Sequence, residues 1–266
     1  MTDSSTSPGR VFATVENGVA NLVLSNPARY NAMSLGMWES LAQLTREADA
    51  DPAVRVLVLQ GDGDKSFVSG ADISEFATVR DNPAQVAHYA NAVRDAQEGL
   101  SACSKPVIAV IRGICMGGGL GLALACDLRY CADDARFRMP AARLGLGYDL
   151  DGTRRMVDIL GAARATELFF TARTFDGREA ARIGFVHQSY APDALAAAVR
   201  ETTSAIAANA PLTLRSAKMS IRHLLGDEDV SASAVADAVA ACFESQDYRE
   251  GQQAFREKRP PQFTGR

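Results

Sequence analysis

The sequence lacks a long apolar run, a pair of cysteines in CxxC spacing, and any cluster of histidine, cysteine and acidic residues with metal-ligand spacing. These absences argue against a membrane-spanning segment, a redox dithiol and a metal centre. The five cysteines are an odd number, which is typical of proteins in the reducing cytosol. We therefore expect no metal, no membrane partner and a cytoplasmic location.

The chain also lacks an excess of positive charge, since 28 Lys and Arg stand against 32 Asp and Glu for a net charge of −4. A nucleic-acid partner is therefore not expected. Residues 1–9 are polar and carry no apolar signal-peptide core, so we interpret them as a short disordered lead. The remaining composition is that of a soluble globular protein, large enough for one sizeable core.

Apolar periodicity predicts alternating short strands and helices in the first part of the chain and mostly helices after residue 153. The Asn17-Gly18 pair predicts a hairpin across residues 10–25. Helices are predicted at residues 35–49, 84–101, 153–171, 176–183, 194–208, 211–225, 230–245 and 248–258, and strands at 54–59, 106–111, 128–132 and 186–190. This alternation favours an α/β fold.

Residues 105–127 predict a buried strand, a turn containing Gly117, Gly118 and Gly119, and an apolar helix. The free N–H groups at the start of such a helix suit an oxygen atom that gains negative charge. A tight turn without a ligand is the other interpretation of this spacing. A second glycine-flanked turn, at residues 61–76, also follows an apolar strand. Two such turns together would hold one carbonyl oxygen by two amides.

Five ordered blocks of the sequence resemble the enoyl-CoA hydratase/isomerase (crotonase) superfamily. KSFVSGADISEF and KPVIAVIRGICMGGGLGLALACDLRYCADDARF resemble its two signatures, and NPARYNAM, residues 163–188 and FREKRPPQF resemble flanking motifs. The resemblance implies a crotonase (ClpP-like) fold of repeated ββα units in residues 10–200, with a helical trimerisation region in residues 201–266. It also implies an acyl-CoA substrate, no prosthetic group, and a homotrimer or a dimer of trimers.

The resemblance implies an oxyanion hole made by the backbone amides of Ala71 and Gly118. True hydratases of this family carry two catalytic glutamates, and this chain has Gly121 and Ala141 at those positions. Neither residue can transfer a proton, so we do not expect an efficient hydratase.

Asp149 aligns with a functional aspartate of the dienoyl-CoA isomerases, whereas Tyr148 resembles a residue of methylmalonyl-CoA decarboxylase. A carboxyl group in a mostly apolar pocket has a raised pKa, which fits a proton shuttle, and we expect leucines of residues 144–150 to form that pocket. The alternative is that Asp149 caps the following helix or pairs with a nearby arginine. Asp151 is the residue we expect to be the cap.

For CoA binding, the resemblance implies residues from three parts of the chain. Lys258 and Phe263 are expected to reach CoA from a neighbouring subunit. For Asp72, in the first signature, the alternative role is to cap the following helix. The implied residues are Arg29, Lys65, Ala71, Asp72, Ile73, Lys258 and Phe263.

The leading interpretation is a double-bond isomerase that stabilises an enolate and uses Asp149 as acid and base. Three alternatives stay open. They are a malonyl-type acyl-CoA decarboxylase, an acyl-CoA-binding pseudoenzyme that lost both glutamates, and a divergent enoyl-CoA hydratase.

Overall fold

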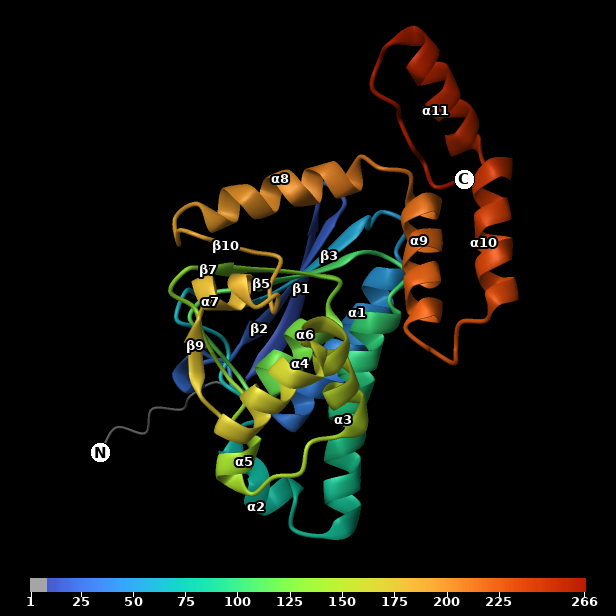
Figure 1. The fold of residues 1–266 in the computed structure, drawn as a ribbon. Helices are drawn as coiled ribbons and strands as arrows, with labels where there is room; N and C mark the ends of the chain where they lie inside the picture. The colour runs from blue at the N-terminus through green and yellow to red at the C-terminus, as the bar shows by residue number, and fades with distance from the viewer. Residues whose placement is uncertain (1–8) are drawn as a thin grey trace.

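The computed structural model describes residues 9–266, apart from the side chain of Ala77, and two β-sheets form its centre (Figure 1). The lead predicted for residues 1–9 lies, except for Gly9, outside the described residues. The larger sheet has the strand order β1-β2-β3-β5-β7-β10, and the smaller has the order β4-β6-β8-β9.

The strands are β1 (Arg10–Glu16), β2 (Val19–Ser25), β3 (Val56–Gly61), β4 (Ser66–Val68), β5 (Val107–Ile111), β6 (Ile114–Met116), β7 (Leu128–Ala132), β8 (Arg136–Arg138), β9 (Thr174–Asp176) and β10 (Gln188–Tyr190). The α-helices are α1 (Leu35–Ala50), α2 (Phe76–Val79), α3 (Pro83–Ala102), α4 (Gly118–Ala125), α5 (Ala141–Leu144), α6 (Leu150–Thr171), α7 (Gly177–Arg182), α8 (Leu195–Ala207), α9 (Pro211–Leu224), α10 (Ala232–Glu244) and α11 (Gln246–Glu257). Two 3-10 helices, η1 (Pro27–Arg29) and η2 (Ile73–Glu75), complete the set.

The predicted hairpin is confirmed. β1 pairs antiparallel with β2, and Asn17 and Gly18 have φ angles of 50° and 78°, as a two-residue turn between right-twisted strands requires. The other neighbours in the larger sheet pair in parallel. The predicted long helices are also present, with ends that differ by a few residues.

The sequence patterns did not predict the strands of the smaller sheet. Its four strands have three residues each, which is too short to display an alternating apolar pattern. In successive repeats, β3 and β4, β5 and β6, and β7 and β8 place one strand in the larger sheet and the next in the smaller. The predicted α/β fold of ββα repeats is therefore confirmed.

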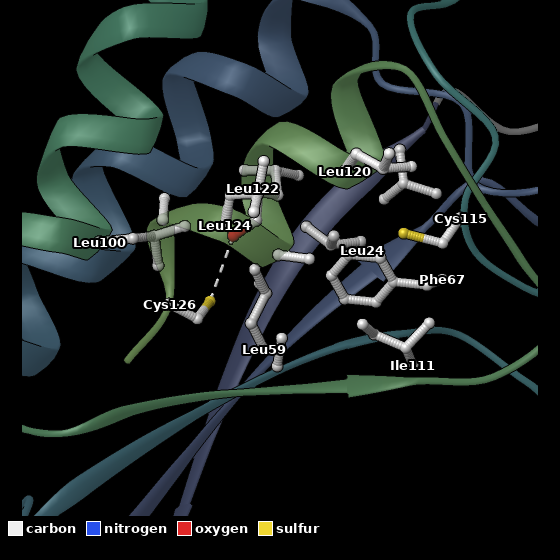
Figure 2. Packing of buried hydrophobic residues seen from close by; sticks show 14 of the residues in the cluster. Leu24, Leu59, Phe67, Leu100, Ile111, Cys115, Leu120, Leu122, Leu124 and Cys126 are labelled. Atoms are coloured by element: carbon white, nitrogen blue, oxygen red, sulfur yellow. Dashed lines mark hydrogen bonds between the residues drawn. The ribbon is translucent and has the colours of Figure 1, made fainter. Parts of the chain in front are cut away.

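Helix α4 lies inside the core, and all its residues from Gly119 to Ala125 are buried. Figure 2 shows Leu120, Leu122 and Leu124 of this helix among buried side chains of the sheets and of α3. A helix that is apolar on every side is stable only when it is enclosed. This enclosure fixes the position of the helix start, where the glycine turn lies.

The cysteines behave as small core residues. Cys126 Sγ donates to Leu122 O over 3.3 Å (Figure 2), and burial raises the pKa of Cys103, Cys126 and Cys131 to about 12. Cys115 is also fully buried, and only Cys242 is partly exposed. The buried thiols therefore stay protonated at neutral pH.

The last four helices, α8 to α11, differ in how they contact the sheets. α8 packs Leu195 and Val199 on the face of the larger sheet opposite α1 and α4, whereas α10 and α11 project away from the body (Figure 1). Large apolar side chains of this region are exposed, including Leu224 at 82% and Phe255 at 87%. The division of the chain at residue 200 into a crotonase core and a helical trimerisation region stays a prediction.

No helix within residues 9–266 is long and apolar enough to cross a membrane.

Gly113 joins three strands of the smaller sheet. Its carbonyl accepts from Arg136 N over 2.8 Å, its φ is 58°, and an added Cβ would lie 2.0 Å from Lys65 O. We expect Gly113→Ala to lower the free energy of unfolding by about 2–5 kcal/mol, from left-handed strain together with overpacking. Denaturant unfolding measures this change.

Gly145→Ala is the matched control, because Gly145 has a φ of 64° but open space around the added Cβ. That variant should lose only about 1–2 kcal/mol, the cost of the left-handed backbone alone. Equal losses in the two variants would show that the contact with Lys65 O carries no energy.

Candidate active site

The glycine turn leads from β6 into α4. Gly117 N donates to Arg138 O over 3.1 Å, which ties the turn to β8. Gly118 is the first residue of α4, so its N–H has no acceptor within the helix. At Gly119 an added Cβ would lie 2.5 Å from Val68 O, so glycine is needed for close packing against β4.

Ala71 lies beside this turn. Met33 N donates to Gly70 O and Asp72 N donates to Met33 O, both over 2.9 Å, so Ala71 forms a parallel bridge with Met33. In that bridge the N–H of Ala71 points away from Met33. An added Cβ on Gly118 would lie 4.0 Å from the carbonyl carbon of Gly70, so the two segments are neighbours. Within residues 9–266, neither the Ala71 nor the Gly118 N–H donates to a protein acceptor.

A buried aromatic pair supports both segments, and the sequence patterns did not indicate it. The Trp38 ring covers Gly118, since an added Cβ there would lie 3.1 Å from Trp38 Cζ2. Trp38 Nε1 donates to Tyr89 Oη over 3.0 Å, and the Tyr89 hydroxyl donates to Met33 O over 3.4 Å. Burial raises the pKa of Tyr89, so the hydroxyl remains a donor. Helices α1 and α3 thus fix the two amide segments together.

Gly121 and Ala141, which the resemblance aligns with the family glutamates, carry no acidic group. The space over Gly121 is filled by other side chains. An added Cβ on Gly121 would lie 2.6 Å from Gln97 Nε2 and 3.3 Å from Tyr148 Oη. A larger residue at 121 must therefore displace Gln97.

We expect Gly121→Glu to be destabilised by about 1–3 kcal/mol through overpacking, and not to gain hydratase activity, because position 141 still lacks an acid. Gln97→Ala should relieve part of the loss when the two changes are combined. A double-mutant cycle by thermal unfolding measures the coupling, with Gln97→Ala alone as the control. Strictly additive losses would contradict the contact.

Tyr148 is half-buried and packs against α6. Its ring centroid lies 5.2 Å from that of Phe169, and an added Cβ on Gly152 would lie 2.6 Å from Tyr148 Cε1. Burial, helped by the negative charge of Asp149, raises the pKa of Tyr148, so its hydroxyl stays protonated at neutral pH.

Asp149 caps α6. Its Oδ1 accepts from Gly152 N over 2.7 Å, so Asp149, rather than the expected Asp151, is the cap of this helix. The expected apolar surroundings are wrong for the isolated chain, because the side chain of Asp149 is exposed and its leucine neighbours lie at the surface. Leu144, Leu146 and Leu150 are 60%, 45% and 73% exposed. Leu144 is the last residue of α5, Leu150 is the first residue of α6, and Leu146 lies in the loop between them.

The residues expected to bind CoA fall into two groups. Arg29 Nη1 pairs with the buried Asp72 Oδ1 at 2.6 Å, and the same oxygen accepts from Ser74 N over 3.0 Å, so Asp72 caps η2. Lys65 and Ile73 are exposed close by in sequence.

The second group lies at the C-terminal end of the chain. Lys258 ends α11, and Phe263 packs against Gly251 of the same helix, on the arm that projects away from α4 (Figure 1). The structure of one chain therefore does not bring Lys258 and Phe263 to Ala71 and Gly118.

Elsewhere in the described part of the chain, one cavity has a basic lining. A cavity of about 290 Å³ lies between α9 and the residues before β3 and β5, with Arg55, Lys105 and Arg215 in its lining, and none of the predicted site residues lines it. Within residues 9–266, no three histidine, cysteine or acidic side chains gather as a metal site.

A strand-to-helix turn with free amides, set in two sheets of ββα repeats, is the arrangement that the resemblance to acyl-thioester enzymes implies. The family model of enoyl-CoA hydratase/isomerase matches residues 14–266. The chain is 34% identical over 252 residues to a crotonyl-CoA hydratase of Syntrophomonas wolfei, which covers 94% of this chain and 96% of the relative. It is 32% identical over 258 residues to a mitochondrial Delta(3,5)-Delta(2,4)-dienoyl-CoA isomerase of Dictyostelium discoideum, covering 92% and 87%.

Among solved structures, an enoyl-CoA hydratase/carnithine racemase from Magnetospirillum magneticum superposes with a TM-score of 0.92 and 36% identity, covering 98% of this chain and 97% of that one. The chain therefore belongs to the enoyl-CoA hydratase/isomerase (crotonase) family, whose members are enzymes. The relatives named above are called hydratase in one case and isomerase in another, so the family alone does not choose the reaction.

Proposed function

We propose that this protein binds acyl-CoA thioesters and stabilises their enolates between the backbone amides of Ala71 and Gly118. The observation that carries the proposal is the pair of neighbouring N–H groups without a protein acceptor within residues 9–266. Two such donors aimed at a developing oxyanion stabilise the transition state, each by about 3–4 kcal/mol. The thioester carbonyl oxygen of the substrate is the group they would hold.

The proposed reaction is double-bond isomerisation with Asp149 as acid and base. The carboxylate would take a proton from one acyl carbon, the electrons would move onto the thioester oxygen, and the proton would return to another carbon. Asp149 Oδ1 caps α6, and no hydrogen bond within residues 9–266 uses Oδ2, which leaves that oxygen for proton transfer. Gly121 and Ala141 carry no proton-transfer group, which disfavours hydration.

A second candidate is decarboxylation of a malonyl-type thioester. Breaking the bond to the carboxylate releases CO2 and leaves its electron pair as the enolate, so no general base is required. Two observations favour it: Asp149 is exposed rather than enclosed by leucines, and the protonated Tyr148 hydroxyl lies over Gly121.

The proposed CoA contacts are those of Arg29, Lys65 and residues 71–73 on one chain, with Lys258 and Phe263 supplied by a neighbouring chain. This arrangement needs a homotrimer or a dimer of trimers, and the exposed apolar surface of α9–α11 would form the interface. The proposed location is the cytoplasm.

A panel of acyl-CoA thioesters incubated in deuterated water and analysed by mass spectrometry tests the proposal. Deuterium at an acyl carbon reports an enolate, a moved double bond identifies the isomerase, and loss of CO2 identifies the decarboxylase. Addition of water across the double bond would instead identify a divergent hydratase. Binding without exchange or turnover of any thioester would identify an acyl-CoA-binding pseudoenzyme and overturn the enolate proposal.

A further inference from the structure

A buried amide lies over Gly121, one turn of α4 beyond the Gly118 N–H, and the reactions proposed above do not use it. Gln97, from α3, is only 5% exposed. Its Oε1 accepts from Arg155 Nη1 of α6 over 3.0 Å. A guanidinium carries donors and no acceptor, so this contact determines which end of the amide faces Arg155.

The NH2 group of Gln97 therefore faces Gly121. An added Cβ on Gly121 would lie 2.6 Å from Gln97 Nε2 and 3.3 Å from Tyr148 Oη, so the two polar atoms converge over the glycine. Within residues 9–266 neither atom donates a hydrogen bond, and neither is among the fully enclosed polar atoms without a partner, a set that contains only Arg80 Nε. Gln97 and Tyr148 thus present two donors that have no protein acceptor within residues 9–266 and keep some exposed surface.

The character of these donors selects the ligand. The raised pKa of Tyr148 keeps its hydroxyl protonated, and the positive charge of Arg155 polarises the Gln97 amide. Both donors suit an acceptor oxygen and neither can serve as a general base. Residues 118 and 121 stand one helical turn apart, about 5–6 Å, which is the span of a few acyl atoms.

We propose that Gln97 Nε2 and Tyr148 Oη bind an oxygen atom of the acyl chain, carried on the carbon two bonds beyond the thioester carbonyl, with Arg155 as the positioning residue of the amide. The substrates are then acyl-CoA thioesters whose third acyl carbon bears a ketone or carboxylate oxygen. This inference rests on the proposed binding of the thioester at Ala71 and Gly118.

Calorimetric titration with butyryl-CoA, acetoacetyl-CoA and malonyl-CoA tests the pair, because the three probes differ at that carbon. The native protein should bind at least one oxygen-bearing thioester about tenfold more tightly than butyryl-CoA, as expected for one or two hydrogen bonds. Gln97→Glu keeps the size and the Arg155 contact but removes the NH2 donor, and Tyr148→Phe removes only the hydroxyl. Each variant should lose most of the preference while butyryl-CoA affinity stays within about twofold.

The role of Arg155 is tested by the ratio of the affinity for the oxygen-bearing thioester to the affinity for butyryl-CoA. Arg155→Leu should reduce the preference for the oxygen-bearing probe, and Arg155→Lys should restore part of it, whereas a merely structural role would change the melting temperature and leave the ratio intact. Preference for acetoacetyl-CoA assigns the pair to a carbonyl, and preference for malonyl-CoA assigns it to a carboxylate.

The outcomes also separate this inference from the proposed function. Native binding of butyryl-CoA without any preference for an oxygen-bearing probe would overturn the Gln97–Tyr148 assignment alone. No binding of any probe would overturn the acyl-CoA proposal together with it. If Gln97→Glu does not fold, Tyr148→Phe carries the test, because its ring keeps the packing against Phe169.

Discussion

Crotonyl-CoA is expected to be hydrated several orders of magnitude more slowly by this protein than by a family member with both glutamates. Adding water across the double bond needs one group to activate the water and another to protonate carbon. Gly121 and Ala141 supply neither, and each lost acid–base group is worth about 10²–10⁴-fold in rate. A steady-state assay of enoyl thioester consumption measures the difference, with a two-glutamate hydratase as reference.

The same preparation should bind butyryl-CoA, which controls for a misfolded site. Turnover near that of the reference hydratase would contradict the prediction and show that other groups have taken over the proton transfers. Tyr148→Phe and Asp149→Asn would then be the first variants to assay, because the Tyr148 hydroxyl lies over Gly121 and Asp149 is the carboxylate next to Tyr148 in the chain.

Asp149→Asn is expected to reduce deuterium exchange or isomerisation by about 10²–10⁴-fold with little loss of CoA affinity, if the carboxylate moves the proton. The variant separates the two roles of the residue. Asparagine caps helices about as well as aspartate, so the contact of Oδ1 with Gly152 N can be kept while the proton-transfer group is removed. Mass spectrometry of thioesters in deuterated water gives the rate, and thermal unfolding gives the stability.

Asp151→Asn is the matched control, since Asp151 lies in the first turn of the same helix and does not cap it. It should change the exchange rate much less. An Asp149→Asn variant with a native rate would identify Asp149 as a helix cap only, and decarboxylation without a general base would become the leading reaction.

The sequence predicted those parts of the fold that have a long repeating pattern or a turn with specific residues. The hairpin at Asn17-Gly18 and the long helices α1 and α3 are examples, because a period of 3.6 or a pair of left-handed residues leaves a clear signal. The three-residue strands of the smaller sheet left none. Their stability comes from pairing between segments far apart in the chain, such as Ser66 with Ile114.

In the candidate site, too, the sequence predicted the residues that lie in motifs and missed those that only the packing of the fold brings together. The glycine turn and the neighbouring Ala71 follow from motifs, whereas Gln97 comes from the middle of a helix and reaches Gly121 only through the packing of α3 on α4. The Arg29–Asp72 pair joins residues 43 positions apart, which no local pattern encodes. The exposure of the leucines around Asp149 depends on the path of a short loop, for which residues 144–150 show no repeating pattern.

The occupied space over Gly121 also constrains how this protein can change by successive substitutions. A glutamate at 121 requires the Gln97 amide to move, and moving that amide breaks its hydrogen bond with Arg155. A glutamate at 121 alone is therefore expected to lower stability without completing a pair of acid–base groups. The effect of a residue at 121 therefore depends on the residue at 97, and substitutions at the two positions are expected to be coupled.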